Sequence, residues 1–257
     1  MLLLCGQGVT QAHVIKRLIA NELQYRHKHY TDACVRIITV RWHMSDDEMS
    51  DEEYLASVRK AREESVRFFD SANKPEREHW VANEFLGNLG VEFTESEIQC
   101  VADEPPDIRF RSASFEVKEI LDKGRRRHAD FKTALEKANS ARSPRDLLEP
   151  VTPRDITYAE VCNLVEAEVV RFAEKYAPAT RSNLDLLFYV NLEDVFGYVA
   201  TPLPPPSKWE VYGFRSVSLV MGRLAGVLMA AQTAPDFLKN NGPRVILKPR
   251  DHEKNAI

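Results

Sequence analysis

Cysteine is scarce in this sequence, and its few copies do not form pairs. The 257 residues include four cysteines, at positions 5, 34, 100 and 162, with no CxxC pair. This spacing argues against a disulfide framework or a zinc ribbon. It favours a reducing, cytoplasmic location.

Long hydrophobic runs are also missing. The longest run near the C-terminus, 217–231, contains Arg223 and is shorter than the ~18–20 residues that a membrane span needs. No basic region precedes the apolar start of the chain, so a secretory signal is not predicted. We interpret 217–231 as a buried core helix and expect no membrane partner.

Neither sign of charge dominates the chain. There are 35 Lys and Arg against 39 Asp and Glu, for a net charge of −4, so a nucleic-acid partner would have to bind a local basic patch. Hydrophobic residues make up 44% and charged residues 29%, as in globular proteins. This composition excludes a wholly disordered chain, a collagen-like repeat and a bare coiled coil.

The first 43 residues differ from the rest, with six Lys and Arg against two Asp and Glu. Met44 and Met49 then stand just before Ser50 and Glu53, a capping box that begins a helix. Residues 1–43 are either a small N-terminal element or an upstream extension that is not native; we favour the extension. Residues 44–257 are expected to form one domain.

Spacing of apolar residues predicts the elements of that domain. Expected helices are 54–69, 76–89 with Gly90 as its C-cap, 125–140, and one beginning at the capping box Thr157–Glu160. Expected strands are 91–93, 107–110, 115–121 and 184–190, followed later by the helix 217–231.

One predicted hairpin carries groups that suit catalysis. If the chain turns at 111–114, Arg109 lies opposite Glu116 and Asp107 opposite Lys118, and all four share one face of the hairpin. Two carboxylates this close repel unless a cation lies between them, and oxygen ligands suit Mg²⁺ or Mn²⁺. Alone, such a pattern is more often a surface hairpin with an incidental ion pair.

The motif Pro106-Asp107 … Glu116-Val117-Lys118 resembles that of the PD-(D/E)xK nuclease superfamily, as does the order helix, three strands, helix, strand. The stretches EREHW, EPPDIRFRSASFEVKEILDKGRR and TPLPPP…FRSVSLV resemble, more narrowly, a bacterial family of unknown function whose members are described as endonucleases. The resemblance implies an α/β fold of restriction-endonuclease-like architecture. It has a mixed central sheet flanked by helices, with extra helices at both ends.

The resemblance also implies roles for individual residues. Asp107 and Glu116 would bind Mg²⁺ or Mn²⁺, and Lys118 would activate water or stabilise the pentavalent phosphorus. Superfamily members often add an acidic residue from the first helix, and we prefer Glu78 to Glu84 because it lies near the helix start. A solvated helix glutamate is the alternative for Glu78.

A basic segment provides the expected contact with nucleic acid. Arg125, Arg126 and Arg127 lie in a stretch, 123–146, with eight Lys and Arg against three Asp and Glu. Such a patch can bind phosphates by releasing counterions, although it can also be a solvated helix face.

The sequence thus predicts a Mg²⁺-dependent endonuclease acting on nucleic acid, with DNA expected first and RNA left open. One alternative is a catalytically inactive nucleic-acid-binding protein of the same fold, which the intact Asp107, Glu116 and Lys118 disfavour. The other is a structural or dimerisation module whose surface is formed by the helices 157–177 and 217–231; the oligomeric state stays open.

Overall fold

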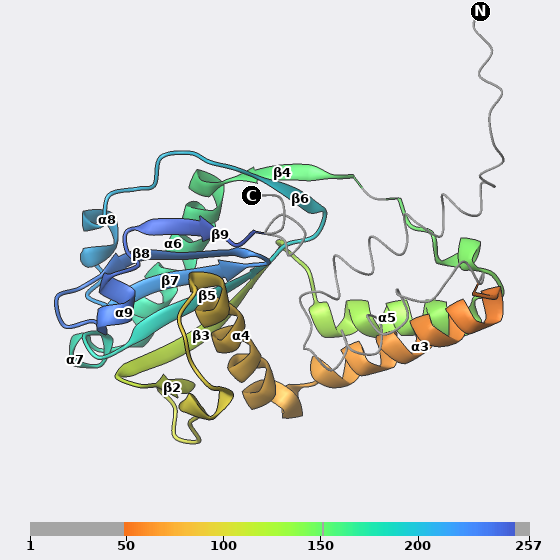
Figure 1. The fold of residues 1–257 in the computed structure, drawn as a ribbon, viewed down its shortest axis with the longest axis horizontal. Helices are drawn as coiled ribbons and strands as arrows, with labels where there is room; N and C mark the ends of the chain where they lie inside the picture. Colours follow the sequence, from red (N-terminus) through yellow and green to blue (C-terminus); the bar gives the residue numbers. More distant parts are fainter. Residues whose placement is uncertain (1–48, 151, 250–257) are drawn as a thin grey trace, which may run out of the picture. The chain divides into compact units, whose positions relative to one another are not determined.

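The computed structural model describes residues 49–150 and 152–249. These form two compact units (Figure 1). Among the described residues, the smaller unit consists of 49–67 and 128–150, and the larger of 68–127 and 152–249. The predicted extension, 1–43, lies outside the described residues.

The smaller unit is a pair of helices, α3 (Asp51–Phe68) and α5 (Arg127–Ser140), followed by the short helix η3 (Pro144–Leu147). Their buried contacts include Tyr54, Leu55, Val58, Ala138 and Ala141. The Arg59 guanidinium donates to the carbonyl of Ala138 at 3.0 Å. This cation stabilises the C-terminal end of α5, where the helix dipole is negative. The helix α5 begins two residues later than expected.

The larger unit contains a mixed seven-stranded sheet, which confirms the predicted α/β core. The strand order is β1-β2-β3-β5-β7-β8-β9, in which β3, β5 and β7 are parallel and the other neighbours antiparallel. The strands are β1 (Ile98–Cys100), β2 (Ile108–Phe110), β3 (Ala113–Leu121), β5 (Asp185–Asn191), β7 (Ser216–Met221), β8 (Leu224–Ala230) and β9 (Arg244–Leu247). A separate parallel pair is formed by β4 (Arg154–Thr157) and β6 (Val195–Val199).

Two helices, α4 (Lys74–Leu89) and α6 (Tyr158–Lys175), cover opposite faces of this sheet. On the central strand β5, Phe188 packs in the cluster that contains α6, whereas Leu187 packs in the cluster that contains α4. Alternate side chains of β5 are therefore buried on both faces, as its nearly continuous apolar sequence predicts. The capping box at the start of α6 and Gly90 at the end of α4, with φ 74°, are both confirmed.

The remaining helices of the described residues are short: η1 (Ser71–Asn73), η2 (Glu95–Glu97), α7 (Pro178–Arg181), α8 (Ser207–Glu210) and α9 (Asp236–Lys239). The extra C-terminal helices that we expected are therefore limited to α8 and α9. No helix in 49–150 or 152–249 is long and apolar enough to cross a membrane.

The predicted core helix 217–231 is wrong, because this segment forms the hairpin of β7 and β8. Apolar residues fill both faces of these strands, so the sequence has no alternation that would distinguish a buried strand from a buried helix. The turn pairs Met221 with Leu224 around Gly222, whose φ of 55° a glycine adopts without strain. The predicted strand 91–93 is also wrong, since β1 begins at Ile98.

The hairpin of β2 and β3 has a different register from the predicted one. Arg109 lies opposite Ser114 rather than Glu116, because the turn is two residues long and begins at Arg111, with φ 51°. A shift by an even number of residues leaves the alternation of side chains unchanged. The Asp107 amide continues the ladder by donating to the Phe115 carbonyl at 3.0 Å.

A buried carboxylate ties the three parallel strands together. Asp185, fully buried at the start of β5, accepts hydrogen bonds from the Ser114 amide at 2.9 Å and the Ser216 hydroxyl at 2.8 Å. Its charge is balanced by Arg215, whose Nε donates to Oδ1 at 3.1 Å. Because one side chain binds groups from β3, β5 and β7, its loss would unpair several buried donors at once.

We expect Asp185→Ala to lower the free energy of unfolding by about 3–5 kcal/mol, since it leaves the Arg215 charge and two other donors unpaired. Urea denaturation measures this change. As the control, Asp236→Ala removes an exposed carboxylate that pairs with Lys239 and should leave stability nearly unchanged. Equal effects of the two substitutions would contradict the role assigned to Asp185.

Candidate functional site

Asp107 stands just before β2 and is held rigidly. It is 2% exposed, and its Oδ2 accepts a hydrogen bond from the Val117 amide at 2.8 Å. β2 pairs with β3 only over residues 108–110, so the Val117 amide has no strand partner on that side. The Asp107 carboxylate takes the place of that partner, which fixes its position relative to β3.

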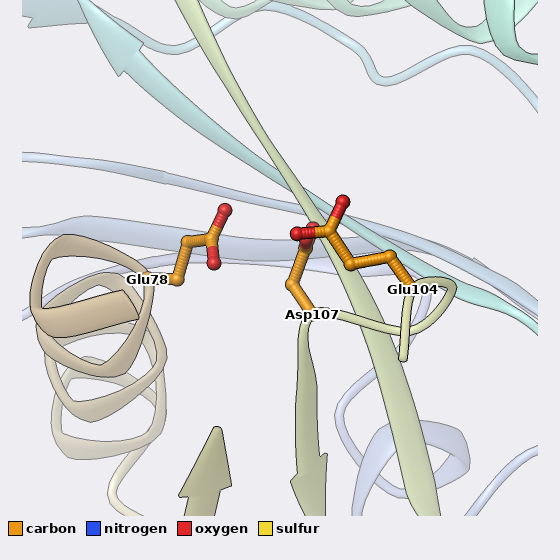
Figure 2. A group of neighbouring side chains, drawn as sticks. All are labelled: Glu78, Glu104 and Asp107. Carbon is orange, nitrogen blue, oxygen red and sulfur yellow. The ribbon is translucent and has the colours of Figure 1, made fainter. Parts of the chain in front are cut away.

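Two further carboxylates approach Asp107 from different elements. Glu78 reaches from α4, and Glu104 comes from the loop before β2 (Figure 2). One oxygen of each of the three side chains lies within 4.8 Å of the others. Glu78 is 9% exposed, whereas Glu104 is exposed. We call Glu78, Glu104 and Asp107 the acidic cluster.

The ammonium of Lys74 lies among these carboxylates. Its Nζ is 2.9 Å from Asp107 Oδ1 and 3.2 Å from Glu78 Oε1, and it also donates to Glu104. Burial by itself lowers the pKa of Lys74, but the hydrogen bonds to the neighbouring carboxylates outweigh it, so the pKa lies above its ordinary value. The Lys74 side chain therefore supplies a positive charge to the cluster.

Sequence reasoning missed Lys74 and Glu104. A signal for Lys74 was present, because a lysine four residues before Glu78 lies on the same helix face. The only sequence feature of Glu104 is that it directly precedes Pro105 and Pro106 of the motif. Nothing in the strand alternation could place it, since it lies in a loop.

Glu116 lies in β3 and is 4% exposed. Its Oε1 accepts a hydrogen bond from the Tyr176 hydroxyl at 2.5 Å and pairs with Lys175 at 3.3 Å, both at the C-terminal end of α6. Its Oε2 is buried and has no hydrogen-bond partner among the described residues. Burial raises the pKa of Glu116, and the charge of Asp107 raises it further, against the hydrogen bond from Tyr176.

Asp107 is thus the common neighbour of carboxylates on both faces of the sheet. Burial raises the pKa of Glu78 to about 7, and the Asp107 charge adds to this effect while Lys74 opposes it. Glu116, on the other face, also responds to Asp107. Asp107 is therefore an electrostatic neighbour of both Glu78 and Glu116, whereas Glu116 is not part of the acidic cluster.

Lys118 is exposed on β3, two residues beyond Glu116. Among the described residues its ammonium makes no hydrogen bond or ion pair. A cavity of about 240 Å³ lies beside it. The cavity is lined by Phe68, Phe69, Lys74, Arg77, Glu78, Trp80, Val81, Val117, Lys118, Glu119, Arg127 and Tyr189. Lys118 therefore borders the same cavity as Glu78 of the acidic cluster and Lys74, which pairs with that cluster.

The three predicted arginines differ in their surroundings. Arg125 donates to the Asn191 carbonyl at 2.9 Å and pairs with Glu193 at 3.2 Å. Arg127 pairs with Glu119, and its guanidinium lies 4.1 Å from the centre of the Phe69 ring. Arg126 is exposed. Arg126 is therefore open to solvent, whereas Arg125 and Arg127 bind other residues of the protein.

The acidic cluster contains only oxygen donors, the ligands that Mg²⁺ and Mn²⁺ prefer. The orphaned Oε2 of Glu116 is a second sign that the residues fit a cation, because a buried acceptor without a partner is costly. Histidine is not part of the cluster in the described residues. The residues that could hold a metal are Glu78, Glu104, Asp107 and Glu116.

Comparisons with known proteins place the chain in a family. A family model described as "Putative endonuclease, protein of unknown function" matches residues 50–254. A solved structure from Pseudomonas aeruginosa strain PAO1 is described as a protein of unknown function of the monooxygenase superfamily. It is 29% identical, with a TM-score of 0.54, and the match covers 79% of this chain and 98% of that chain. No curated protein matches the chain. The predicted family is confirmed, whereas the PD-(D/E)xK superfamily stays a prediction.

The shifted pKa of Glu78 predicts how the stability of the metal-free protein depends on pH. The folded protein keeps a proton on Glu78 up to about pH 7, whereas the unfolded chain releases it near pH 4.5. The folded state thus binds more protons in this window, and stability falls as the pH rises through it. We expect Glu78 to contribute a loss of about 1–3 kcal/mol.

Urea denaturation in EDTA between pH 4.5 and pH 8 measures this loss. Glu78→Gln should flatten the profile, whereas Glu76→Gln, an exposed change on the same helix, should keep the wild-type slope. A Glu78→Gln profile as steep as that of the wild type would show that Glu78 does not titrate in this range.

Proposed function

This chain belongs to the family of unknown function whose description names an endonuclease, and we propose that it is a metal-dependent nuclease. It would hydrolyse phosphodiester bonds in nucleic acid, with DNA as the first expected substrate. One observation carries the proposal: Glu78, Glu104 and Asp107 each bring a carboxylate oxygen within 4.8 Å of the others. Like charges this close repel, and a divalent cation bound between them would relieve that repulsion.

The metal ligands in this proposal are Asp107, Glu116 and Glu78, as expected from the sequence, with Glu104 added. Mg²⁺ or Mn²⁺ bound there would polarise a phosphoryl oxygen and lower the pKa of a water molecule. The hydrogen bond from the Val117 amide orients Asp107, and Tyr176 orients one oxygen of Glu116. The other oxygen of Glu116 remains available as a ligand.

Lys118 has the position and the charge for the catalytic role. By strand alternation it shares a face with Glu116, and it borders the cavity beside the acidic cluster. In the proposed reaction its ammonium orients the attacking water or stabilises the charge that grows on the phosphorus oxygens. The segment 125–127 contacts the phosphate backbone, and exposed Arg126 is the side chain that reaches it.

The description of the Pseudomonas aeruginosa protein names an oxygenase superfamily instead. Non-haem iron oxygenases bind iron with two histidines and one carboxylate. The acidic cluster of this chain consists of carboxylates alone within the described residues. This donor set favours a hard cation and hydrolysis, and for that reason we prefer the nuclease.

A catalytically inactive nucleic-acid-binding protein is the second candidate. The observation that favours it is the Lys74 ammonium, which already supplies a counter-charge to the acidic cluster without a metal. The dimerisation module loses support, because one of its two predicted helices, 217–231, is the β7–β8 hairpin.

Lys118→Ala distinguishes an enzyme from a binding protein. We expect it to leave the melting temperature and the nucleic-acid affinity nearly unchanged, because the side chain is exposed. The single-turnover cleavage rate with Mg²⁺ or Mn²⁺ should fall by about 10²–10³, the size found when a group that stabilises transition-state charge is removed. DNA and RNA substrates, duplex and single-stranded, are measured at saturating protein.

Lys239→Ala, which removes a lysine of helix α9 that pairs with Asp236 and lies outside the acidic cluster, is the control and should cleave at the wild-type rate. If Lys118→Ala also cleaves at that rate, Lys118 is not catalytic. A wild-type protein that binds nucleic acid but cleaves none of the substrates with either metal would favour the inactive binding protein.

The basic segment yields a separate prediction. Arg126→Ala should weaken binding about equally for all sequences and lower the salt slope by about one, as for a lost phosphate contact. Its melting temperature should not change. Arg127→Ala should instead lower the melting temperature, because Glu119 loses its ion pair and Phe69 loses the guanidinium beside its ring. Fluorescence anisotropy at several salt concentrations and thermal unfolding measure both effects; an unchanged salt slope for Arg126→Ala would contradict the contact.

A further inference from the structure

Lys74 occupies the position where a cation would bind the acidic cluster. Its ammonium contacts all three carboxylates, at 2.9 Å from Asp107, 3.2 Å from Glu78 and through a hydrogen bond to Glu104. The three acids come from a helix and from a loop, so a single ammonium links α4 to the segment before β2. The lysine on the other side of the site, Lys175, pairs with Glu116 instead.

The Lys74 side chain also has space to move away from the acidic cluster. Its side chain is 42% exposed, whereas those of Glu78 and Asp107 are 11% and 2% exposed. The Glu78 and Asp107 carboxylates are therefore held in the interior, whereas Lys74 and Glu104, whose side chain is 48% exposed, lie at the surface. A lysine ammonium is a compact charge on a flexible four-carbon stem, and the Lys74 stem borders the cavity, which offers space for another position.

An ammonium and a divalent metal cannot use these oxygens together. Mg²⁺ approaches its oxygen ligands to about 2.0–2.1 Å and demands nearly octahedral geometry. An ion at that distance from Asp107 and Glu78 would lie close to the present position of Nζ, and the two positive charges would repel strongly.

We propose that Lys74 is the resident counter-cation of the acidic cluster and that a divalent metal binds by displacing it. Glu104, held by Lys74 in the structure, is then released to the metal as a ligand from the loop. The inference rests on the proposed function, because it concerns the same metal site. It assigns Lys74 a positioning role: the ammonium holds the three carboxyl groups close together until the metal arrives.

Titration calorimetry with Mg²⁺ alone tests the exchange. Lys74→Met keeps the length of the side chain and removes the charge, so it should raise the affinity for Mg²⁺ by about tenfold or more. Lys74→Arg keeps a competing charge and should stay near the wild-type affinity. The control, Lys208→Met, removes an ion-paired lysine outside the cluster and should bind Mg²⁺ like the wild type.

Thermal unfolding gives a second measurement. In EDTA, Lys74→Met should melt below the wild type, because the carboxylates lose their counter-charge. Saturating Mg²⁺ should then raise its melting temperature by more than it raises that of the wild type, since a ligand of the folded state stabilises that state. Lys74→Gln serves as a second neutral variant. If both neutral variants fail to fold with and without Mg²⁺, Lys74 is only structural and the exchange is wrong.

Asp107→Asn separates this inference from the proposed function. If the wild type binds no Mg²⁺, or if Asp107→Asn binds it equally well, the metal site of the proposed function is wrong and the exchange fails with it. If Asp107→Asn abolishes binding while Lys74→Met binds no more tightly than the wild type, the metal site stands and the exchange alone is overturned.

Discussion

Repulsion between carboxylates around β3 is the constraint on which this site depends. Burial raises the pKa of Glu78 on one face of the sheet and of Glu116 on the other, and the charge of Asp107, which is itself almost completely buried, raises both further. A cluster of this kind is stable only when protons or cations balance it. Lys74 and Lys175 each supply one cation, and the buried Oε2 of Glu116 still has no partner among the described residues. This remaining acceptor is the reason that we propose a bound cation at the site.

The fold supplies the geometry through the short length of β2. Because β2 pairs with only part of β3, the Val117 amide would be unpaired, and the carboxylate of Asp107 satisfies it. The same hydrogen bond draws a negative charge into the interior beside Glu116. On the parallel strands the buried Asp185 binds β3 and β7 and is fully compensated by Arg215. The two buried aspartates therefore have different roles. Asp185 links the strands of the sheet, and Asp107 places a carboxylate beside Glu78 and Glu116.

Strand alternation and helix capping predicted much of this fold from the sequence. The register of the β2–β3 hairpin was wrong by two residues, an error that preserves the side-chain face, so the prediction that Asp107 and Glu116 share a face does not depend on it. The hairpin of β7 and β8 was missed because an apolar run carries no periodicity when both faces are buried. Glu104 was missed because it lies in a loop, and no local pattern places that loop beside the helix, whereas the spacing of four residues between Lys74 and Glu78 was a signal that we did not use.

The three lysines around the acids differ in how their charges are used, and this difference bears on the chemistry. Lys74 is bound by the acidic cluster and Lys175 by Glu116, so both ammonium groups serve mainly to balance carboxylates. Lys118, within the described residues, forms no such pair, although it lies two residues from Glu116 and beside the cavity. An ammonium that is not neutralised by the protein can stabilise an anion from outside, such as a phosphate group. In the proposed hydrolysis, Lys118 is therefore the lysine of the three whose charge would act on the substrate.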